Sequence, residues 1–322
     1  MAVGNVTNMV IRPDFFREGM IETIDQQVQV FNAASSNALT FSTLALAGDF
    51  AKTSFIKRLT NVIQSRDDES DDPVDSTVLN QEDDVAVKIK RRIGPFEQTR
   101  DAFISAGMSP EELSFFLGNQ VGEEALKDYM DSILLALYGA TLNDESENHV
   151  DGTGAVISPS VLIDGMRRFG DGWNRIAAIV MHSKPFFDYM DDAVTEGQTD
   201  LQFAAVFNAQ VGTFNKPVIV TDSDSLVVDG TPDTYRTWLL QSQAGNVTES
   251  VTPYITDEEV FGSENLKIRI QGEHAFNLDV LGYSYNEGAG KNPSDAALAA
   301  SASWESLFSN IKDRAGIMIE TQ

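Results

Sequence analysis

The side chains that most often do chemistry are few in this sequence and do not form a catalytic pattern. The three histidines are His149, His182 and His274, and none has the His-x-x-x-His spacing of a zinc-binding helix. His182 precedes Ser183, but adjacent strand residues point to opposite faces, and no G-x-S-x-G elbow surrounds this serine. We therefore predict that Ser183 caps a following helix, and we predict no catalytic site and no zinc site.

Acidic runs are the second chemical feature, because carboxylate oxygens are the ligands that calcium prefers. Asp222 and Asp224 form one run and residues 67–75 form another, yet neither has the glycine and terminal glutamate of the twelve-residue calcium loop. A phosphate-binding loop and a dinucleotide fingerprint are also missing, and the absence of cysteine excludes disulfides and thiolate chemistry. The sequence therefore predicts no bound metal and no cofactor, and the acidic runs are interpreted as solvated loops.

Charge is segregated along one segment of the chain. An acidic group comes first and a basic group follows it. The acidic group is Asp67, Asp68, Glu69, Asp71 and Asp72, and the basic group is Lys88, Lys90, Arg91 and Arg92. Opposite charges that are separated in this way can pair between copies of the chain, with the acidic part of one copy against the basic part of the next. We predict that these residues form an intersubunit contact.

These charges must be positioned by the elements around them. Residues 55–63 and 85–93 have the composition of two strands, and Val85, Val87 and Ile89 alternate with polar or small residues. The acidic segment between the two strands is longer than the ~12 to 15 residues of an ordinary loop. We predict a hairpin with a projecting loop. The preceding residues 1–47 are expected to form an extended arm that lies on other subunits or on the body of its own chain, and residues 13–31 are compatible with a short helix.

A long helix is predicted after this hairpin. Ser109, Pro110 and Glu112 match a capping box with proline in the first turn, and Gly139 marks the end of the apolar pattern. Between them runs an apolar stripe with helical spacing, formed by Leu126, Tyr129, Met130, Ile133, Leu134 and Leu137. Gly118 and Gly122 lie inside the helix, where they indicate either a bend or close packing. We interpret the stripe as core.

Helices and strands alternate in the next part of the chain, which predicts an α/β domain. Helices are expected from Ser158 and from Ser183, and strands at 175–182, 217–221 and 235–241. Further strands are expected at 247–256, 266–272, 274–285 and 316–321. After Gly288 and Gly290, Asn292 and Pro293 are predicted to cap a short helix, and Trp304 is predicted to anchor this part of the chain.

The composition limits the classes of protein to which the chain can belong. Its 322 residues suffice for one large or two medium domains, and its hydrophobic fraction of 42% is that of a folded protein. The 49 acidic and 23 basic residues give a formal charge of −26, which argues against a surface that neutralises nucleic-acid phosphates. Neither a signal peptide nor an apolar run of the ~20 residues needed to span a membrane is found. We predict synthesis in the cytosol and no membrane binding.

Residues 281–305, LGYSYNEGAGKNPSDAALAASASWE, resemble the C-terminal part of the major capsid proteins of tailed bacteriophages. In that family a strand and a glycine loop lead through an NP(S/T)DAEL helix to the sequence NWE. The segments IAAIVMHSKPFFDYM and VGTFNKPVIVTDSDSL also resemble family segments, and the order of arm, loop, long helix and α/β domain agrees with the family. The resemblance implies an α+β fold of the Hong Kong 97-like type.

On this resemblance the chain is divided into five parts. They are an N-terminal arm at 1–47, an extended β-hairpin loop at 48–100, a peripheral domain at 101–149 with a spine helix at 109–139, an axial α/β domain at 150–250, and peripheral strands with the C-terminus at 251–322.

The resemblance also implies a function. We expect a non-enzymatic major capsid protein of a tailed double-stranded DNA phage, assembled in the host cytoplasm and located in the virion. Its first partner is itself, in pentamers and hexamers of an icosahedral head that encloses DNA without sequence-specific binding. The segment before the spine helix is short for a fused scaffold domain, so a separate scaffolding protein is expected, together with a portal protein and, as an optional partner, a decoration protein.

Two alternatives remain open at this point. An encapsulin-like compartment shell has the same fold and would enclose an enzyme cargo instead of DNA. A soluble acidic α/β hydrolase or metal-binding enzyme would need acids and bases gathered in one pocket.

Overall fold

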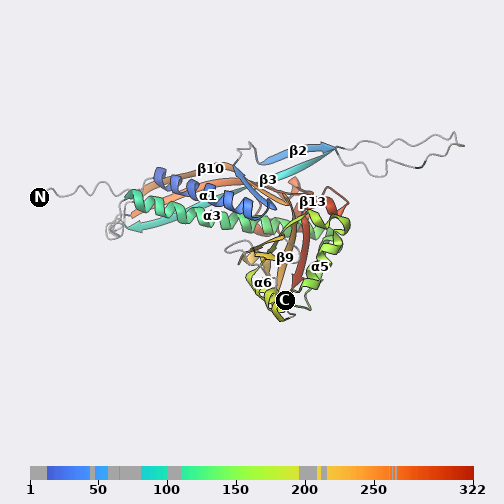
Figure 1. Cartoon of the computed structure of the whole chain (residues 1–322). Coiled ribbons are helices and arrows are strands. Elements are labelled where there is room, and N and C mark those ends of the chain that lie inside the picture. The colour runs from blue at the N-terminus through green and yellow to red at the C-terminus, as the bar shows by residue number, and fades with distance from the viewer. Residues whose placement is uncertain are drawn as a thin grey trace, which may run out of the picture.

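The structure is a computed structural model that describes residues 13–43, 48–56, 65, 81–99, 110–195, 209–211, 216–260, 262, 264 and 267–322. The α-helices of these residues are α1 (Pro13–Ala34), α3 (Pro110–Thr141), α4 (Glu145–Asn148), α5 (Pro159–Arg168), α6 (Ser183–Thr195) and α7 (Asp295–Leu298). The strands described form two sheets, and Figure 1 shows the second sheet at the C-terminal end of α3.

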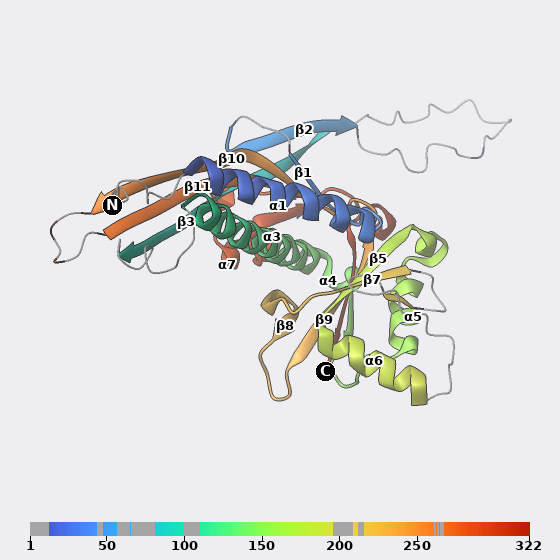
Figure 2. The same ribbon diagram turned by 60° about the vertical axis from the view of Figure 1, so that its left-hand side comes forward.

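The first sheet has the order β1-β10-β11-β12-β13, with β3 beside β11 and β2 beside β3. Its strands are β1 (Leu39–Thr43), β2 (Phe50–Ile56), β3 (Gln81–Thr99), β10 (Gly245–Val260), β11 (Lys267–Val280), β12 (Tyr283–Tyr285) and β13 (Trp304–Ser306). One face of this sheet is covered by α1 and α3, as Figure 2 shows. The predicted break between strands at residue 273 is absent, because β11 continues through it and has an irregularity between Ile270 and Gly272.

The apolar stripe of α3 is confirmed as core. Tyr129, Ile133, Leu134 and Leu137 are buried, and Leu126 and Met130 are packed against the same cluster. This cluster contains side chains of both sheets, so the C-terminal half of α3 joins the two sheets through one contiguous core. The helix ends at Thr141, two residues beyond the predicted Gly139, because Gly139 packs closely on another segment: a Cβ there would lie 2.2 Å from the carbonyl oxygen of Leu298.

The helix compatible with residues 13–31 is confirmed as α1, which continues to Ala34, and of the two supports expected for the arm the structure shows the body of its own chain. Residues 13–34 form a helix on α3, and β1 pairs in parallel with β10, so this segment packs on its own subunit. The physical reason is that Phe16, Met20 and Ile24 recur every four residues and form one buried apolar face. Residues 1–12 and 44–47 lie outside the described residues.

Close contact between α1 and α3 explains the glycines inside α3. A Cβ at Gly118 would lie 2.2 Å from the carbonyl oxygen of Phe16, and one at Gly122 would lie 3.1 Å from that of Met20. Gly19 of α1 has the reciprocal role, because its Cβ would lie 2.6 Å from the carbonyl oxygen of Phe115. Of the two interpretations given to Gly118 and Gly122, close packing is the one that the structure supports.

The structure describes the base of the predicted hairpin, where its two strands pair. β2 pairs antiparallel with the first part of β3, from Phe50 opposite Val87 to Ile56 opposite Gln81. β3 then continues alongside β11 as far as Thr99, so it is longer than the predicted 85–93, and β2 begins before the predicted 55–63. Most of the connecting segment, including Asp67, Asp68, Glu69, Asp71 and Asp72, lies outside the described residues.

The second sheet has the order β4-β14-β9-β5-β7-β6, with β8 beside β9. Its strands are β4 (His149–Gly152), β5 (Ile176–Met181), β6 (Ala209–Val211), β7 (Lys216–Val220), β8 (Val227–Val228), β9 (Thr234–Gln241) and β14 (Gly316–Thr321). The division into domains stays a prediction, but the last strand was predicted with the peripheral strands of residues 251–322 and belongs to the second sheet instead. β14 lies between β4 and β9, because Ile317 and Ile319 are buried in the core of this sheet.

Two predicted helix caps are wrong. At α6, His182 Nδ1 accepts the backbone N–H of Lys184 at 3.2 Å, while Ser183 is the first helical residue. At α7, the cap is Ser294, whose hydroxyl accepts the N–H of Ala297. Asn292 cannot lead directly into a right-handed helix because its φ is +50°, and its side chain accepts the N–H of Lys90 instead.

The predicted anchor role of Trp304 is confirmed. Its indole Nε1 donates to the carbonyl oxygen of Leu298 at 2.8 Å, and its ring meets that of Tyr285 edge-on with centroids 5.5 Å apart. A Cβ on Gly139 would lie 3.0 Å from this Nε1, so the indole sits directly against α3.

Candidate intersubunit surface

The basic group of the predicted contact lies on β3, where the strand passes from its pairing with β2 to its pairing with β11. Neighbouring side chains of a strand point to opposite faces. Arg91 accordingly contacts α3, whereas Lys90 pairs with Asp49 on the other face of the sheet. The basic residues therefore differ in their surroundings, although they are adjacent in the sequence.

Arg91 joins three elements of the subunit. Its Nε lies 3.0 Å from Asp128 Oδ2 of α3, and its Nη2 lies 2.7 Å from Asp295 Oδ1 of α7. Nη2 also donates to the hydroxyl of Ser132 at 3.1 Å. Burial raises the pKa of Asp128, and the charge of Arg91 opposes this effect. Arg91 is thus engaged inside its own subunit.

Lys90 is engaged by an acidic partner next to β2. Its Nζ lies 3.0 Å from Asp49 Oδ1, and Lys291 Nζ lies 2.9 Å from Asp49 Oδ2. Hydrogen bonds from Lys291 and Lys90 hold the pKa of Asp49 at about 2. Because these groups are exposed, their ion pairs contribute little to the stability of the subunit. We expect them mainly to fix the positions of the segments that carry Asp49, Lys90 and Lys291 relative to one another.

Lys88 and Arg92 complete the basic group. Lys88 is only 8% exposed and lies opposite Asn277 of β11. Arg92 is exposed and, among the residues that the structure describes, has no ion-pair partner. Of the basic residues predicted to contact a neighbour, Arg92 is therefore the one that the fold leaves available.

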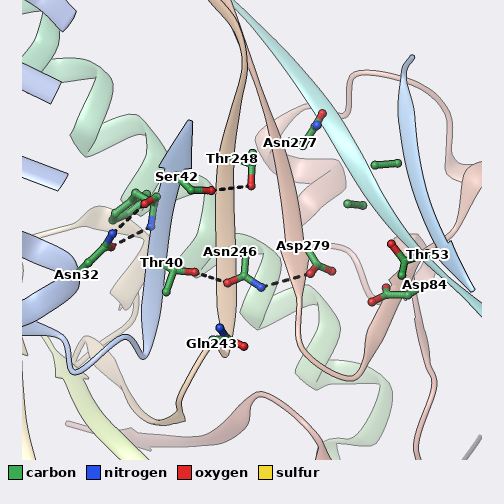
Figure 3. A pocket seen from close by; sticks show the side chains of 13 residues that line it. Asn32, Thr40, Ser42, Thr53, Asp84, Gln243, Asn246, Thr248, Asn277 and Asp279 are labelled. Atoms are coloured by element: carbon green, nitrogen blue, oxygen red, sulfur yellow. Dashed lines mark hydrogen bonds between the residues drawn. The ribbon is translucent and has the colours of Figure 1, made fainter. Parts of the chain in front are cut away.

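The outer face of the first sheet, opposite α1 and α3, carries a polar pocket that sequence analysis missed. Its volume is about 540 Å³. Figure 3 shows its side chains, which come from β1, β10, β11, β3 and β2 and from segments beside them. Its polar side chains include Asp84 of β3, Asp279 and Asn277 of β11, Asn246 of β10 and Thr53 of β2.

Two carboxylates in this pocket influence each other. Burial, together with the charge of Asp279, raises the pKa of Asp84 to about 7. Burial also raises the pKa of Asp279, and the Nδ2 group of Asn246, which lies 3.4 Å from Asp279 Oδ2, opposes this rise. The sequence contained one signal for this site, since Asn277 and Asp279 alternate with the buried Phe276, Leu278 and Val280. The approach of Asp84 depends on strand pairing and could not be predicted.

The histidines do not gather into a catalytic arrangement in the described part of the chain. His149 lies between Glu145 and Glu320, at 3.5 and 3.6 Å, and His182 lies 3.6 Å from Asp222. His274 is buried next to Tyr129, and burial lowers its pKa to about 4. Among the described residues there is no group of three or more histidine or carboxylate side chains placed to hold a metal ion. No helix in this part of the chain is both long and apolar enough to cross a membrane.

A spine helix along a long-stranded sheet, with a second α/β sheet at its end, is the fold of tailed-phage capsid subunits. The structure superposes with a TM-score of 0.57 on the acidic stable capsid structure of Helicobacter pylori bacteriophage KHP30, with 10% identity over 88% of each chain. It superposes with a TM-score of 0.54 on a structure from Mycobacterium phage Adephagia, with 8% identity over 90% of each chain. These likenesses establish the fold, and the predicted Hong Kong 97-like fold is confirmed.

Sequence comparison establishes the family. The major capsid protein of Bacillus phage SPP1 is 27% identical in an alignment 261 residues long, which covers 74% of this chain and 77% of that protein. Residues 8–318 match the Gp13-like family, described as major capsid protein 13-like, and the chain therefore belongs to this family of major capsid proteins. It is a structural component of the phage capsid and not an enzyme, which decides against the hydrolase alternative.

Proposed function

We propose that this chain assembles with copies of itself into the pentamers and hexamers of an icosahedral head that encloses double-stranded DNA. The observation that supports this proposal most directly is the β2–β3 ribbon, which projects from the body of the subunit in Figure 1. From Gln81 to Ala86, β3 pairs within its sheet with β2 alone, and Ile56 at the outer end of β2 is 68% exposed. The base of the ribbon is held by its own subunit, because the hydroxyl of Ser284 accepts the N–H of Val85 and the ring of Phe55 packs on that of Phe308. Ile56 stays exposed beyond this base, and a two-stranded ribbon that continues alone is only marginally stable in water, so we propose that a neighbouring subunit covers its outer part.

The arrangement of the strands in two sheets supports the proposed division of the subunit into domains. We propose residues 48–100 as the extended loop, 109–139 as the spine helix and 150–244 together with β14 as the axial domain. The predicted boundary at 250 moves to 244 in this proposal, because β10 begins at Gly245 and pairs with β1 and β11 of the first sheet, which we take as the peripheral domain. We keep a separate scaffolding protein and a portal protein as proposed partners. The formal charge of −26 supports enclosure of DNA without adhesion to it, because an acidic wall repels the phosphate backbone.

Sedimentation velocity of the purified chain over a range of ionic strengths, with and without its scaffolding protein, tests the proposal. We expect material that sediments as capsomers and as far larger closed particles. A chain that stays monomeric under every condition, including with the scaffolding protein, would contradict the proposed assembly.

The intersubunit charge contact has a test of its own. We propose that Arg92 meets the acidic group of residues 67–72 in a neighbouring subunit. Exposed ion pairs contribute up to ~1 kcal/mol each. Because one such contact would form for each subunit, Arg92→Glu should raise the critical concentration for assembly about fivefold or more, while the unassembled subunit keeps its melting temperature.

A compensating variant makes this test specific. Arg92→Glu combined with Asp71→Lys and Asp72→Lys should bring the critical concentration back toward that of the unmodified chain, as measured by light scattering. If Arg92→Glu assembles like the unmodified chain, or if the compensating changes give no recovery, Arg92 does not form this contact.

A further inference from the structure

The polar pocket on the outer face of the first sheet is built in register across five strands. Thr40 of β1 lies opposite Asn246 of β10, and Asn246 lies opposite Asp279 of β11. On the other side of the pocket, Asp84 of β3 lies opposite Thr53 of β2. Figure 3 shows Asp84 and Asp279 on this same face of the sheet. The pocket thus brings together two carboxylates from strands that are distant in the sequence.

A chain of hydrogen bonds holds one of these carboxylates in place. The hydroxyl of Thr40 donates to Asn246 Oδ1, which fixes the orientation of the amide. The Nδ2 group of Asn246 then lies 3.4 Å from Asp279 Oδ2. The other oxygen, Asp279 Oδ1, is buried and has no hydrogen-bond partner among the described residues, and the same is true of Asp84 Oδ1. Two buried carboxylate oxygens in one pocket therefore lack a partner of opposite charge or a donor.

Asn277 provides an independent observation. Its side chain lines the same pocket and is only 3% exposed. Its Nδ2 group is buried and has no acceptor in the described part of the chain. A buried amide group without a partner is destabilising, so the pocket is expected to contain a group that accepts its hydrogen bond. Water of a second layer, which accepts from Asn277 and from the waters bound directly to an ion, supplies such an acceptor.

We propose that this pocket binds one divalent cation, preferentially Ca²⁺, with Asp84 and Asp279 as its carboxylate ligands. The hydroxyl of Thr53 lies beside Asp84 as a further oxygen donor. Calcium accepts six to eight oxygen ligands in flexible geometry, whereas magnesium requires a near-ideal octahedron and gives up its water reluctantly. Two carboxylates and a hydroxyl from three strands form an irregular set of oxygen ligands, which suits calcium, and calcium would complete its coordination with water. Because the ligands belong to β3 and β11, the ion would fix the base of the projecting ribbon to the body of the subunit.

Isothermal titration calorimetry and thermal unfolding of the full chain with calcium chloride, above neutral pH, test this proposal. The variants are Asp84→Asn and Asp279→Asn, and the matched control is Asp83→Asn, which removes the same charge from the exposed residue next to Asp84. Calcium is expected to raise the melting temperature of the unmodified chain and of Asp83→Asn by several degrees, with a saturable binding isotherm. It should raise that of the other two variants by no more than sodium chloride of equal ionic strength does.

Two results would overturn the proposal. An equal calcium effect in all four proteins would show general screening of an acidic chain. The lack of a calcium effect in the unmodified chain would show that no cation binds, and a higher melting temperature of Asp84→Asn in that case would indicate that a shared proton satisfies the two carboxylates.

Discussion

Replacing Gly118 with alanine is expected to destabilise the subunit by about 1–3 kcal/mol and to loosen α1 from α3. The added methyl group would lie 2.2 Å from the carbonyl oxygen of Phe16, and backbone cannot yield as a flexible side chain does. Alanine is favoured over glycine inside a helix by up to ~1 kcal/mol, so two effects compete. The clash is expected to dominate, because relieving it requires α1 to move as a whole and to weaken the packing of Phe16 and Met20.

The matched control is Gly122→Ala in the same helix. The gain in helix propensity is the same there, but the new Cβ would lie 3.1 Å from the nearest backbone atom. Urea unfolding should show Gly118→Ala clearly less stable than Gly122→Ala, which should lie close to the unmodified chain. Equal stability of the two variants would contradict the close packing of α1 on α3.

Replacing Arg91 with methionine is expected to destabilise the subunit by about 1–3 kcal/mol. The change keeps much of the apolar volume but removes the partner of Asp128 and of Asp295, and it leaves the hydroxyl of Ser132 without its donor. Breaking a buried ion pair costs ~3–5 kcal/mol, and the Arg91 side chain is 24% exposed, so we expect a smaller loss. The pKa of Asp128 should rise further, because only Arg91 counteracts the effect of burial strongly.

The adjacent residue provides the control for this variant. Arg92→Met removes the same charge from the same strand, but Arg92 is exposed and has no ion-pair partner among the described residues. Thermal unfolding should show a lower melting temperature for Arg91→Met and an unchanged one for Arg92→Met. The reverse order, or equal effects, would contradict the assignment of Arg91 to folding and of Arg92 to assembly.

Because Arg91 is engaged inside its own subunit and Arg92 is not, the basic residues of this segment must be tested one at a time. The sequence suggested that the basic residues Lys88, Lys90, Arg91 and Arg92 act together between subunits. Their intramolecular partners come from residues 49, 128 and 295, which are far apart in the sequence and are brought together only by the fold. Reversal of all four charges would therefore destabilise the subunit and weaken assembly for separate reasons.

The features that the sequence predicted well are those with a local, repeated signal. The stripe of α3 follows the helical period over several turns, so its burial could be predicted without knowing what covers it. β5 and β7 are short apolar runs and were also found. The order of the elements and the C-terminal segment then identified the family, whose assignment the comparison confirmed.

The features that the sequence did not predict depend on contacts between distant segments. Asn292 and Pro293 resemble a helix cap, but the left-handed backbone of Asn292 places its side chain on the N–H of Lys90. Gly272 resembles the end of a strand, yet β11 continues through it. Glycine is needed there because a Cβ would lie 2.9 Å from the carbonyl oxygen of Tyr254. Asp84 and Asp279 meet because β3 and β11 are neighbours, and no local pattern marks that pairing.

The central claim is that the subunit folds through its own contacts and functions through contacts made by its projecting ribbon in a closed shell. Cryo-electron microscopy of assembled particles tests it most directly. We predict closed icosahedral shells in which the ribbon of each subunit, extended beyond β2 and β3, crosses a neighbouring subunit and places its acidic group near Arg92 of that neighbour. A map in which every ribbon folds back on its own subunit, or particles that are small and open, would contradict this account.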